Sequence, residues 1–230
     1  MARGPGVTSP MESKRNRVHP VPQRRPARLE IAALAATLLS YIWLWKGSFP
    51  GNVPIVLVLY FGIGIEGHIR RRETARDVGI RLDNVAVACR TVLPWIGPIL
   101  VAIAVVGVLL HGWHPPRALL GSVIWHLGWG IVQQYGLLCI FYRRLREIFS
   151  RAGAAEVAGG LIFALFHLPN PFLAPLAAVL GTLACWLYRR EPNLLVLGVA
   201  HGLVGFMLTH ALPGTLTWMM RVGPAVLKMW

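Results

Sequence analysis

The sequence has few acidic residues and little charge of either sign. Only nine of its 230 residues are Asp or Glu, and all charged residues together make up 14% of the chain. A soluble protein needs a far larger polar surface, so this composition excludes an ordinary soluble fold. Hydrophobic residues make up 55% of the chain, and there are nine tryptophans. This is the profile of an integral membrane protein, and the length suits a single domain.

Cysteine is also scarce. Cys89, Cys139 and Cys185 lie within or beside apolar runs, and their number is odd. A disulfide framework is therefore not indicated, and we expect buried thiols that behave as small hydrophobic side chains. Closely spaced metal ligands such as an HExxH motif are absent as well, so metal binding is only weakly signalled.

Lysine and arginine exceed the acids strongly, which gives a formal net charge of +14. Such an excess can indicate nucleic acid as a partner, but the hydropathy of this chain favours arginines that anchor membrane helices at the cytoplasmic surface. We therefore expect a lipid bilayer around the protein and no nucleic acid. Arg70, Arg71, Arg143, Arg144 and Arg189 are among these predicted anchors.

The chain divides into a tail and a series of apolar runs. Residues 1–29 hold seven basic residues and five prolines, which predicts a disordered basic cytoplasmic tail. Residues 30–230 are predicted to form an all-α, polytopic transmembrane domain. A signal peptide is disfavoured, because the basic region is long and no small-residue cleavage site follows the first run. The predicted helices cover 31–45, 55–67, 92–113, 119–142, 155–168, 172–188 and 193–211, with 215–230 as an eighth, interrupted candidate.

The distribution of basic residues predicts the topology. The loops after the second, fourth and sixth runs are basic, whereas those after the first, third and fifth contain at most one basic residue. This alternation satisfies the positive-inside rule if the N-terminus is cytoplasmic. The sequence thus predicts a multi-pass bundle of seven or eight transmembrane helices. Because the amino-acid composition is typical of a bacterial chain, we expect this bundle in a bacterial inner membrane.

Isolated polar side chains interrupt three of the apolar runs. They are Gln133 and Gln134 in the fourth run, His167 at the end of the fifth, and His201 in the seventh. Polar groups inside membrane helices usually face the bundle interior and mark a functional site. A single polar group can also serve only to form a hydrogen bond between two helices. Adjacent glutamines point about 100° apart on a helix, so both are not expected in one narrow groove. His126 lies two turns before Gln133 at nearly the same azimuth.

Three further features have a structural interpretation. Gly198, Gly202 and Gly205 around His201 predict close approach of another helix. Asn170 is predicted to cap the helix that follows it. Histidines at helix ends, namely His68, His111, His114 and His210, are expected to reach the membrane interface.

The segments FALFHLPN and GTLACWLYRREPNLLVLGVAHGLVG resemble the CPBP family, the CAAX prenyl proteases and bacteriocin-processing proteins. The family pattern is a Glu pair followed by Arg, then Phe-x-x-x-His, then His-x-x-x-Asn, on three core helices. Phe163 and His167 match the second motif, and His201 begins the third. The resemblance covers about residues 117–210.

The sequence departs from the family at four positions. Gln133 and Gln134 replace the Glu pair, Leu138 stands at the Arg position, and Gly205 replaces Asn. In the family, the first Glu is taken to activate water with help from the His of the second motif, and the last His and Asn stabilise the oxyanion. A glutamine cannot accept that proton near neutral pH. By the family's mechanism, the chain is expected to have little or no activity.

The resemblance implies an intramembrane endopeptidase that acts on a membrane-associated or lipidated polypeptide. His167 would then hold or activate water, and His201 would stabilise an oxyanion. Gln133 and Gln134 would orient water or a substrate carbonyl, and Phe163 and His126 would contact the substrate. In an alternative interpretation, His167 and His201 would hold a divalent metal that lowers the pKa of bound water. The competing hypothesis is a pseudoenzyme, in which the same groove binds a peptide or lipid chain without cutting it.

Overall fold

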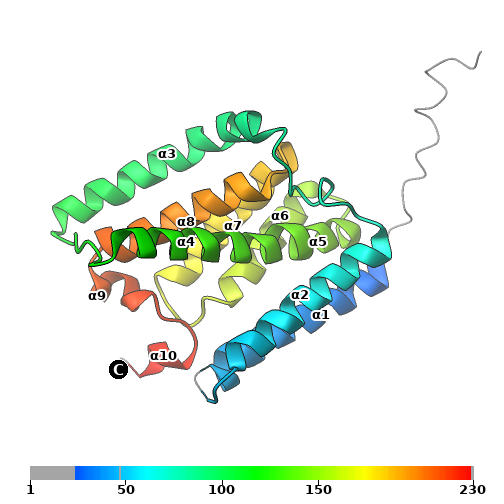
Figure 1. The fold of residues 1–230 in the computed structure, drawn as a ribbon, viewed down its shortest axis with the longest axis horizontal. Coiled ribbons are helices and arrows are strands. Elements are labelled where there is room, and N and C mark those ends of the chain that lie inside the picture. The colour runs from blue at the N-terminus through cyan, green and yellow to red at the C-terminus, as the bar shows by residue number, and fades with distance from the viewer. Residues whose placement is uncertain (1–23, 47, 229–230) are drawn as a thin grey trace, which may run out of the picture.

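A computed structural model describes residues 24–46 and 48–228, and this part of the chain is helical without a β-strand (Figure 1). The long elements are α1 (Arg24–Ser40), continued by the π-helical η2 (Tyr41–Trp45), α2 (Asn52–Arg71), α3 (Val85–Leu109), α4 (Leu119–Gln134), α6 (Ala152–Leu165), α7 (Leu173–Arg190) and α8 (Leu194–Ala211). Between α4 and α6, the helix continues through η3 (Tyr135–Tyr142) and α5 (Arg143–Ile148). The short elements α9 (Gly214–Thr217), η4 (Trp218–Met220) and α10 (Pro224–Leu227) complete the chain.

Each of the seven predicted apolar runs corresponds to a helical segment, which confirms the all-α membrane bundle. Within the described residues, four helices are long and apolar enough to cross a membrane: Arg24–Trp45, Asn52–Arg71, Val85–Leu109 and Leu194–Ala211. Their outward side chains are exposed hydrocarbon, such as Val101 and Leu109, which are 63% and 69% exposed. A bilayer is the environment that stabilises such a surface.

The structure corrects the predicted boundary between the tail and the first helix. The first helix begins at Arg24, so residues 24–29 are helical rather than part of a disordered tail. Pro26 does not prevent this start, because proline is tolerated in the first turn of a helix. The remainder of the predicted tail, residues 1–23, lies outside the described residues.

The predicted eighth helix is not formed as a continuous span in the described residues. Trp218 and Gly223 have φ of 54° and 64°, and these left-handed conformations divide the segment into α9, η4 and α10. Residues 229–230 of the predicted run lie outside the described part of the chain.

Glycines bring the core helices together in pairs. A Cβ atom on Gly130 of α4 would lie 2.5 Å from the carbonyl oxygen of Gly198 on α8, and one on Gly202 would lie 2.6 Å from the carbonyl oxygen of His126. Gly160 of α6 likewise has no room for a side chain against α7. The predicted close approach at Gly198 and Gly202 is therefore present, since a single methyl group would separate these helices.

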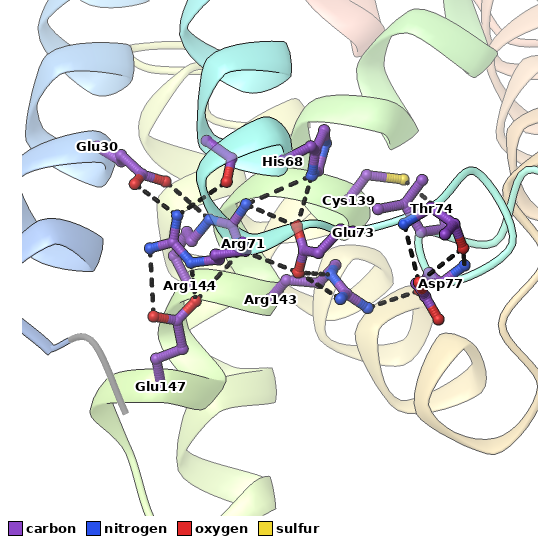
Figure 2. A network of polar contacts seen from close by, with 12 residues as sticks. Glu30, His68, Arg71, Glu73, Thr74, Asp77, Cys139, Arg143, Arg144 and Glu147 are labelled. Carbon is purple, nitrogen blue, oxygen red and sulfur yellow. Dashed lines mark hydrogen bonds and ion pairs between the residues drawn. The ribbon is translucent and has the colours of Figure 1, made fainter. Parts of the chain in front are cut away.

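A buried ion-pair network fastens the α1–α2 hairpin to α5 at one end of the bundle (Figure 2). Arg144 is completely buried and donates to Glu30 at 2.8 Å and to Glu73 at 2.9 Å. Arg71 donates to Glu30 at 2.6 Å and to Glu147 at 2.7 Å. Removing one partner from such a network typically costs about 3–5 kcal/mol, because the remaining charges stay buried without compensation.

The network corrects the predicted role of three basic residues and of His68. Arg71 and Arg144 are not exposed anchors, and half-buried Arg143 also binds Glu73 rather than solvent alone. The side chain of His68 does not extend outward as expected, because it is buried and its Nδ1 donates to Glu73 at 2.7 Å. Burial opposes ionisation of Glu73, but hydrogen bonds from His68 and Arg144 and the nearby arginine charges hold its pKa well below the usual range.

Candidate functional site

A cavity of about 590 Å³ lies between the α1–α2 hairpin and the core helices α4, α7 and α8. The hairpin contributes the end of α1 and the beginning of α2, so the cavity and the ion-pair network occupy opposite ends of this hairpin. The walls are mostly aliphatic and aromatic. All the predicted catalytic and substrate-binding residues line this one cavity: His126, Gln133, Gln134, Phe163, His167 and His201.

Gln133 and Gln134 both line the cavity, contrary to the expectation that one groove would not receive both. The cavity is wide enough to meet side chains that point about 100° apart. Gln134 is only 2% exposed, whereas Gln133 is half-buried. The Oε1 atom of Gln134 is buried and has no hydrogen-bond partner among the described residues. A buried amide oxygen left without a partner is a place where a water or a substrate N–H is expected to bind.

Gln134 determines the tautomer of His201. Its Nε2 atom lies 3.0 Å from Nδ1 of His201, and an amide nitrogen can only donate. The proton of the neutral imidazole is therefore on Nε2. His201 consequently offers an N–H donor from its other ring nitrogen, which is the group that an oxyanion needs.

His167 has the opposite arrangement. It lies in the turn after α6, which ends at Leu165 rather than at residue 168, because a residue that precedes proline disfavours helical geometry and Pro169 follows Leu168. Nδ1 of His167 donates to the carbonyl oxygen of Phe163 at 2.7 Å. Its Nε2 therefore keeps a lone pair that can accept a proton or a hydrogen bond.

Phe163 holds the two imidazoles in one part of the cavity. Its ring centroid is 4.7 Å from that of His167 and 5.6 Å from that of His201, and both contacts are edge-to-face. The ring of Phe163 is therefore an apolar surface that the acceptor, His167, and the donor, His201, both contact. Phe163 thus positions the histidines, in addition to its predicted contact with substrate.

His126 is engaged within the protein, although it lines the cavity. Its Nδ1 donates to the carbonyl oxygen of Ser122 at 2.7 Å, and its Nε2 lies 3.3 Å from Oγ1 of Thr209. Both ring nitrogens therefore have partners on α4 and α8. A contact with substrate would use the face or the carbon edge of this ring.

The two other departures from the family pattern have different surroundings. Leu138 is fully buried in the hydrophobic core, where an arginine would require a partner for its charge. Gly205 lines the cavity, and a Cβ atom there would be 3.7 Å from Cδ2 of His126, an ordinary contact. Gly205 therefore does not serve close helix packing as the sequence suggested, and a small polar side chain would fit at this position.

Tyr60 and two tryptophans of the cavity were not identified from the sequence. The hydroxyl group of Tyr60 on α2 donates to the carbonyl oxygen of Val132 at 2.5 Å, immediately before the glutamine pair. The α-helix changes to the π-helix η3 directly after Gln134, and such changes recur at functional sites. Trp125 and Trp129 are stacked on the exposed face of α4 at the cavity wall. No sequence motif signals these features.

The residues present do not complete a metal centre. Within the described part of the chain, no group of three or more His, Cys, Asp or Glu side chains is placed to hold a metal ion. Catalytic zinc sites use three protein ligands, and His167 and His201 supply two imidazoles beside amides that bind zinc poorly. Among the described residues, a metal held by His167 and His201 would thus have no third protein ligand.

Asn170 and Glu156 have structural roles near the site. The Oδ1 atom of Asn170 accepts hydrogen bonds from the backbone N–H groups of Phe172 and Leu173, both at 2.9 Å, which confirms the predicted cap. Its Nδ2 donates to the carbonyl oxygens of Thr217 and Arg221, so it also fixes the C-terminal segment. Glu156 is buried and pairs with Arg189 across α6 and α7.

The fold and this cavity define a class of protein: a polytopic helical membrane protein with a polar site inside its bundle. Residues 131–207 match one family model, described as type II CAAX prenyl endopeptidase Rce1-like. The matched segment is less than half of the chain, yet it contains both glutamines, Phe163, His167 and His201. Over this segment the chain is therefore similar to the CAAX-protease family model, as the motifs indicated. Neither the curated proteins nor the solved structures gave a match.

Proposed function

We propose that this CPBP-type, endopeptidase-like membrane protein hydrolyses a peptide bond in a membrane-associated or lipidated polypeptide. The observation that carries the proposal is the complementary state of two histidines in one apolar cavity. His167 presents a free acceptor nitrogen, and His201 presents an N–H donor. A base and an oxyanion donor are the two groups that peptide hydrolysis by water requires.

In the proposed reaction, water donates one proton to Nε2 of His167 while its oxygen attacks the carbonyl carbon of the substrate. The negative charge that develops on the carbonyl oxygen is stabilised by the Nε2–H group of His201. When the C–N bond breaks, the imidazolium of His167 returns the proton to the leaving amine. Gln133 and the unpartnered Oε1 of Gln134 orient the water or a substrate N–H.

The substrate class follows from the cavity wall. Most of the lining is aliphatic or aromatic, with the polar groups gathered near the glutamine pair. An apolar chain or the hydrophobic side chains of a membrane-bound peptide would be buried against this wall, at about 25 cal/mol per Å² of apolar area. A soluble, highly charged peptide would not be buried against this wall.

A second candidate function is a pseudoenzyme that binds the same peptide or lipid chain. Among the described cavity residues there is no carboxylate, and amides cannot replace one as a base. This observation favours binding without cleavage if His167 alone is too weak a base in its apolar surroundings.

The two functions are separated by cleavage of a quenched, lipidated peptide library by purified protein. We expect the wild type to cut and His167→Ala to lose at least about a hundredfold in rate, within the range attributed to a general base. A wild type that is inactive while Gln133→Glu cuts would identify the natural protein as a binding module. Equal rates for wild type and His167→Ala would refute the assigned base. Full activity with EDTA present would argue against a required metal.

We further propose that the protein lies in a bacterial inner membrane with its N-terminus in the cytoplasm. The alternation of basic segments supports this orientation, because arginines gather at the end of α2 and in the loop after it, in α5, and at the end of α7. The ion-pair network would then lie at the cytoplasmic end, and the cavity would occupy the other half of the bundle.

A further inference from the structure

A second polar cluster joins the beginning of α4 to the end of α8. It contains Ser122, His126, Thr209 and His210, together with His114 from the connecting segment before α4. The ring centroid of His210 is 5.7 Å from those of both His114 and His126. The sequence predicted only interfacial positions for His114 and His210, but the structure turns both toward this cluster.

Ser122 differs in its hydrogen bond from four threonines of the long helices. Thr37, Thr91, Thr182 and Thr209 each donate to the carbonyl oxygen four residues earlier, which is the usual bond in a helix. The Oγ atom of Ser122 instead lies 2.9 Å from Nε2 of His210. This is the spacing of an activated nucleophile and its base.

The contact of Nδ1 of His210 decides which group donates in the hydrogen bond between Ser122 and Nε2 of His210. Its Nδ1 lies 3.3 Å from the carbonyl oxygen of His114, which can only accept, so Nδ1 carries the proton of the neutral ring. Nε2 is then the acceptor, and Ser122 must donate to it. The backbone N–H of His114 donates in return to the carbonyl oxygen of His210 at 2.9 Å, and this reciprocal pair fixes the imidazole.

Donors for a developing oxyanion are close to Ser122. α4 begins at Leu119, and the N–H of Ser122 is already bonded to the carbonyl oxygen of Ala118. The N–H groups of the first residues of a helix have no partner within it, so the turn around Gly121 presents donors beside the hydroxyl group. A Cβ atom on Gly121 would have only one neighbour within 4 Å, at 3.9 Å, so the approach is open.

The surroundings indicate the chemical class of a substrate. Leu119, Leu120 and Trp125 on this end of α4 are 57%, 73% and 66% exposed, which suits an acyl chain in a bilayer. His210 is oriented by a carbonyl oxygen and not by a carboxylate. A base held in this way is suited to an ester, whose alcohol leaves more easily than the amine of an amide.

We propose that Ser122 is a nucleophile, with His210 as its base, and that it accepts the acyl group of a lipid-like ester at the membrane surface. Oγ forms a bond with the carbonyl carbon as the serine proton passes to Nε2 of His210. The bond to the alcohol oxygen breaks, and the alcohol takes that proton. Water, deprotonated by His210, then releases the fatty acid and restores the hydroxyl group.

The test is labelling of the purified full-length protein by a fluorophosphonate that carries a long alkyl chain. We expect the mass of the probe on the peptide that contains Ser122, and none there in Ser122→Ala. Labelling should fall at least about tenfold in His210→Gln, because the hydroxyl group loses its base. Thr91→Ala, which removes a hydroxyl group bonded to its own helix, is the matched control and should be labelled like the wild type.

Hydrolysis of a p-nitrophenyl ester of a long-chain fatty acid should be lost in the same two variants. If His210→Gln does not fold, the pH dependence of labelling in the wild type replaces it, and the rate should rise as an imidazole loses its proton. A wild type labelled no more than Ser122→Ala would overturn the proposal. So would undiminished labelling of folded His210→Gln, or a rate that is independent of pH.

Discussion

At the scale of single residues, hydrogen bonds give chemically identical side chains different roles. His167 and His201 line the same cavity and both contact Phe163. At Nε2, however, His167 is a hydrogen-bond acceptor and His201 is a donor. The cause is the partner of the other ring nitrogen: a carbonyl oxygen for His167 and an amide N–H for His201. The glutamine at 134 therefore has a defined function even though it cannot act as a base.

The tautomer of His201 can be tested directly. In Gln134→Leu, we expect the ¹⁵N signals of His201 to change from the Nε2–H tautomer to a mixture, because its Nδ1 loses the amide donor. His167 is the internal control, since its tautomer depends on the carbonyl group of Phe163. Peptide cleavage should fall about 10²-fold if the oxyanion donor is lost with the tautomer. An unchanged His201 spectrum would show that Gln134 does not fix the ring.

Glu73 predicts how stability depends on pH. The pKa of Glu73 is lowered in the folded protein. Its ionised carboxylate therefore adds its full contribution to the free energy of unfolding above the ordinary pKa of a glutamate, about 4.3. That contribution is lost as the pH falls toward the pKa that Glu73 has in the folded protein. Thermal unfolding in detergent should therefore show wild type more stable than Glu73→Gln at pH 7. We expect this difference to shrink below about pH 4. A difference that stays constant down to pH 3 would contradict the assigned ionisation.

At the scale of elements, the site is built by two helices that touch at glycines. α4 carries the glutamines and α8 carries His201, and the hydrogen bond between Gln134 and His201 at 3.0 Å needs this close approach. The π-helical turn after Gln134 then carries the chain to Arg144, which anchors the α1–α2 hairpin. Packing of α4 on α8 thus decides whether the site exists.

A pair of glycine substitutions one turn apart tests this packing. Gly202→Val should destabilise the protein by about 1–3 kcal/mol, because even its Cβ would lie 2.6 Å from a carbonyl oxygen of α4. Gly205→Ala should be tolerated, since its Cβ meets its nearest neighbour at 3.7 Å. Thermal unfolding of the two variants gives the comparison. Equal unfolding temperatures would mean that α4 and α8 are not held at this distance.

At the scale of the whole molecule, charge and polarity are separated along the bundle. The buried ion pairs lie at the end where α2 meets α5, and the cavity extends toward the other end of the α1–α2 hairpin. Figure 1 shows this hairpin beside the core helices, with α3 along α8 on another side. The hairpin is therefore fixed to the core at one end and borders the cavity at the other.

The orientation in the membrane can be tested by thiol labelling of intact cells. Arg76→Cys lies in the loop after α2, and Arg117→Cys lies in the segment before α4, in a background without the native cysteines. An impermeant reagent should label Arg117→Cys and not Arg76→Cys before lysis, because the arginine-rich loop is expected to be cytoplasmic. The reverse pattern would invert the topology.

The sequence by itself determined the helical membrane class, the seven apolar runs and six of the residues that line the cavity. It did so because hydropathy over membrane-length segments, and isolated polar groups within them, are local properties. The tertiary structure alone decided the tautomers of His167 and His201, the burial of Arg144, and the pairing of Ser122 with His210. These depend on which atoms of distant helices come within about 3 Å, and hydrogen-bond direction follows from that contact and not from residue type.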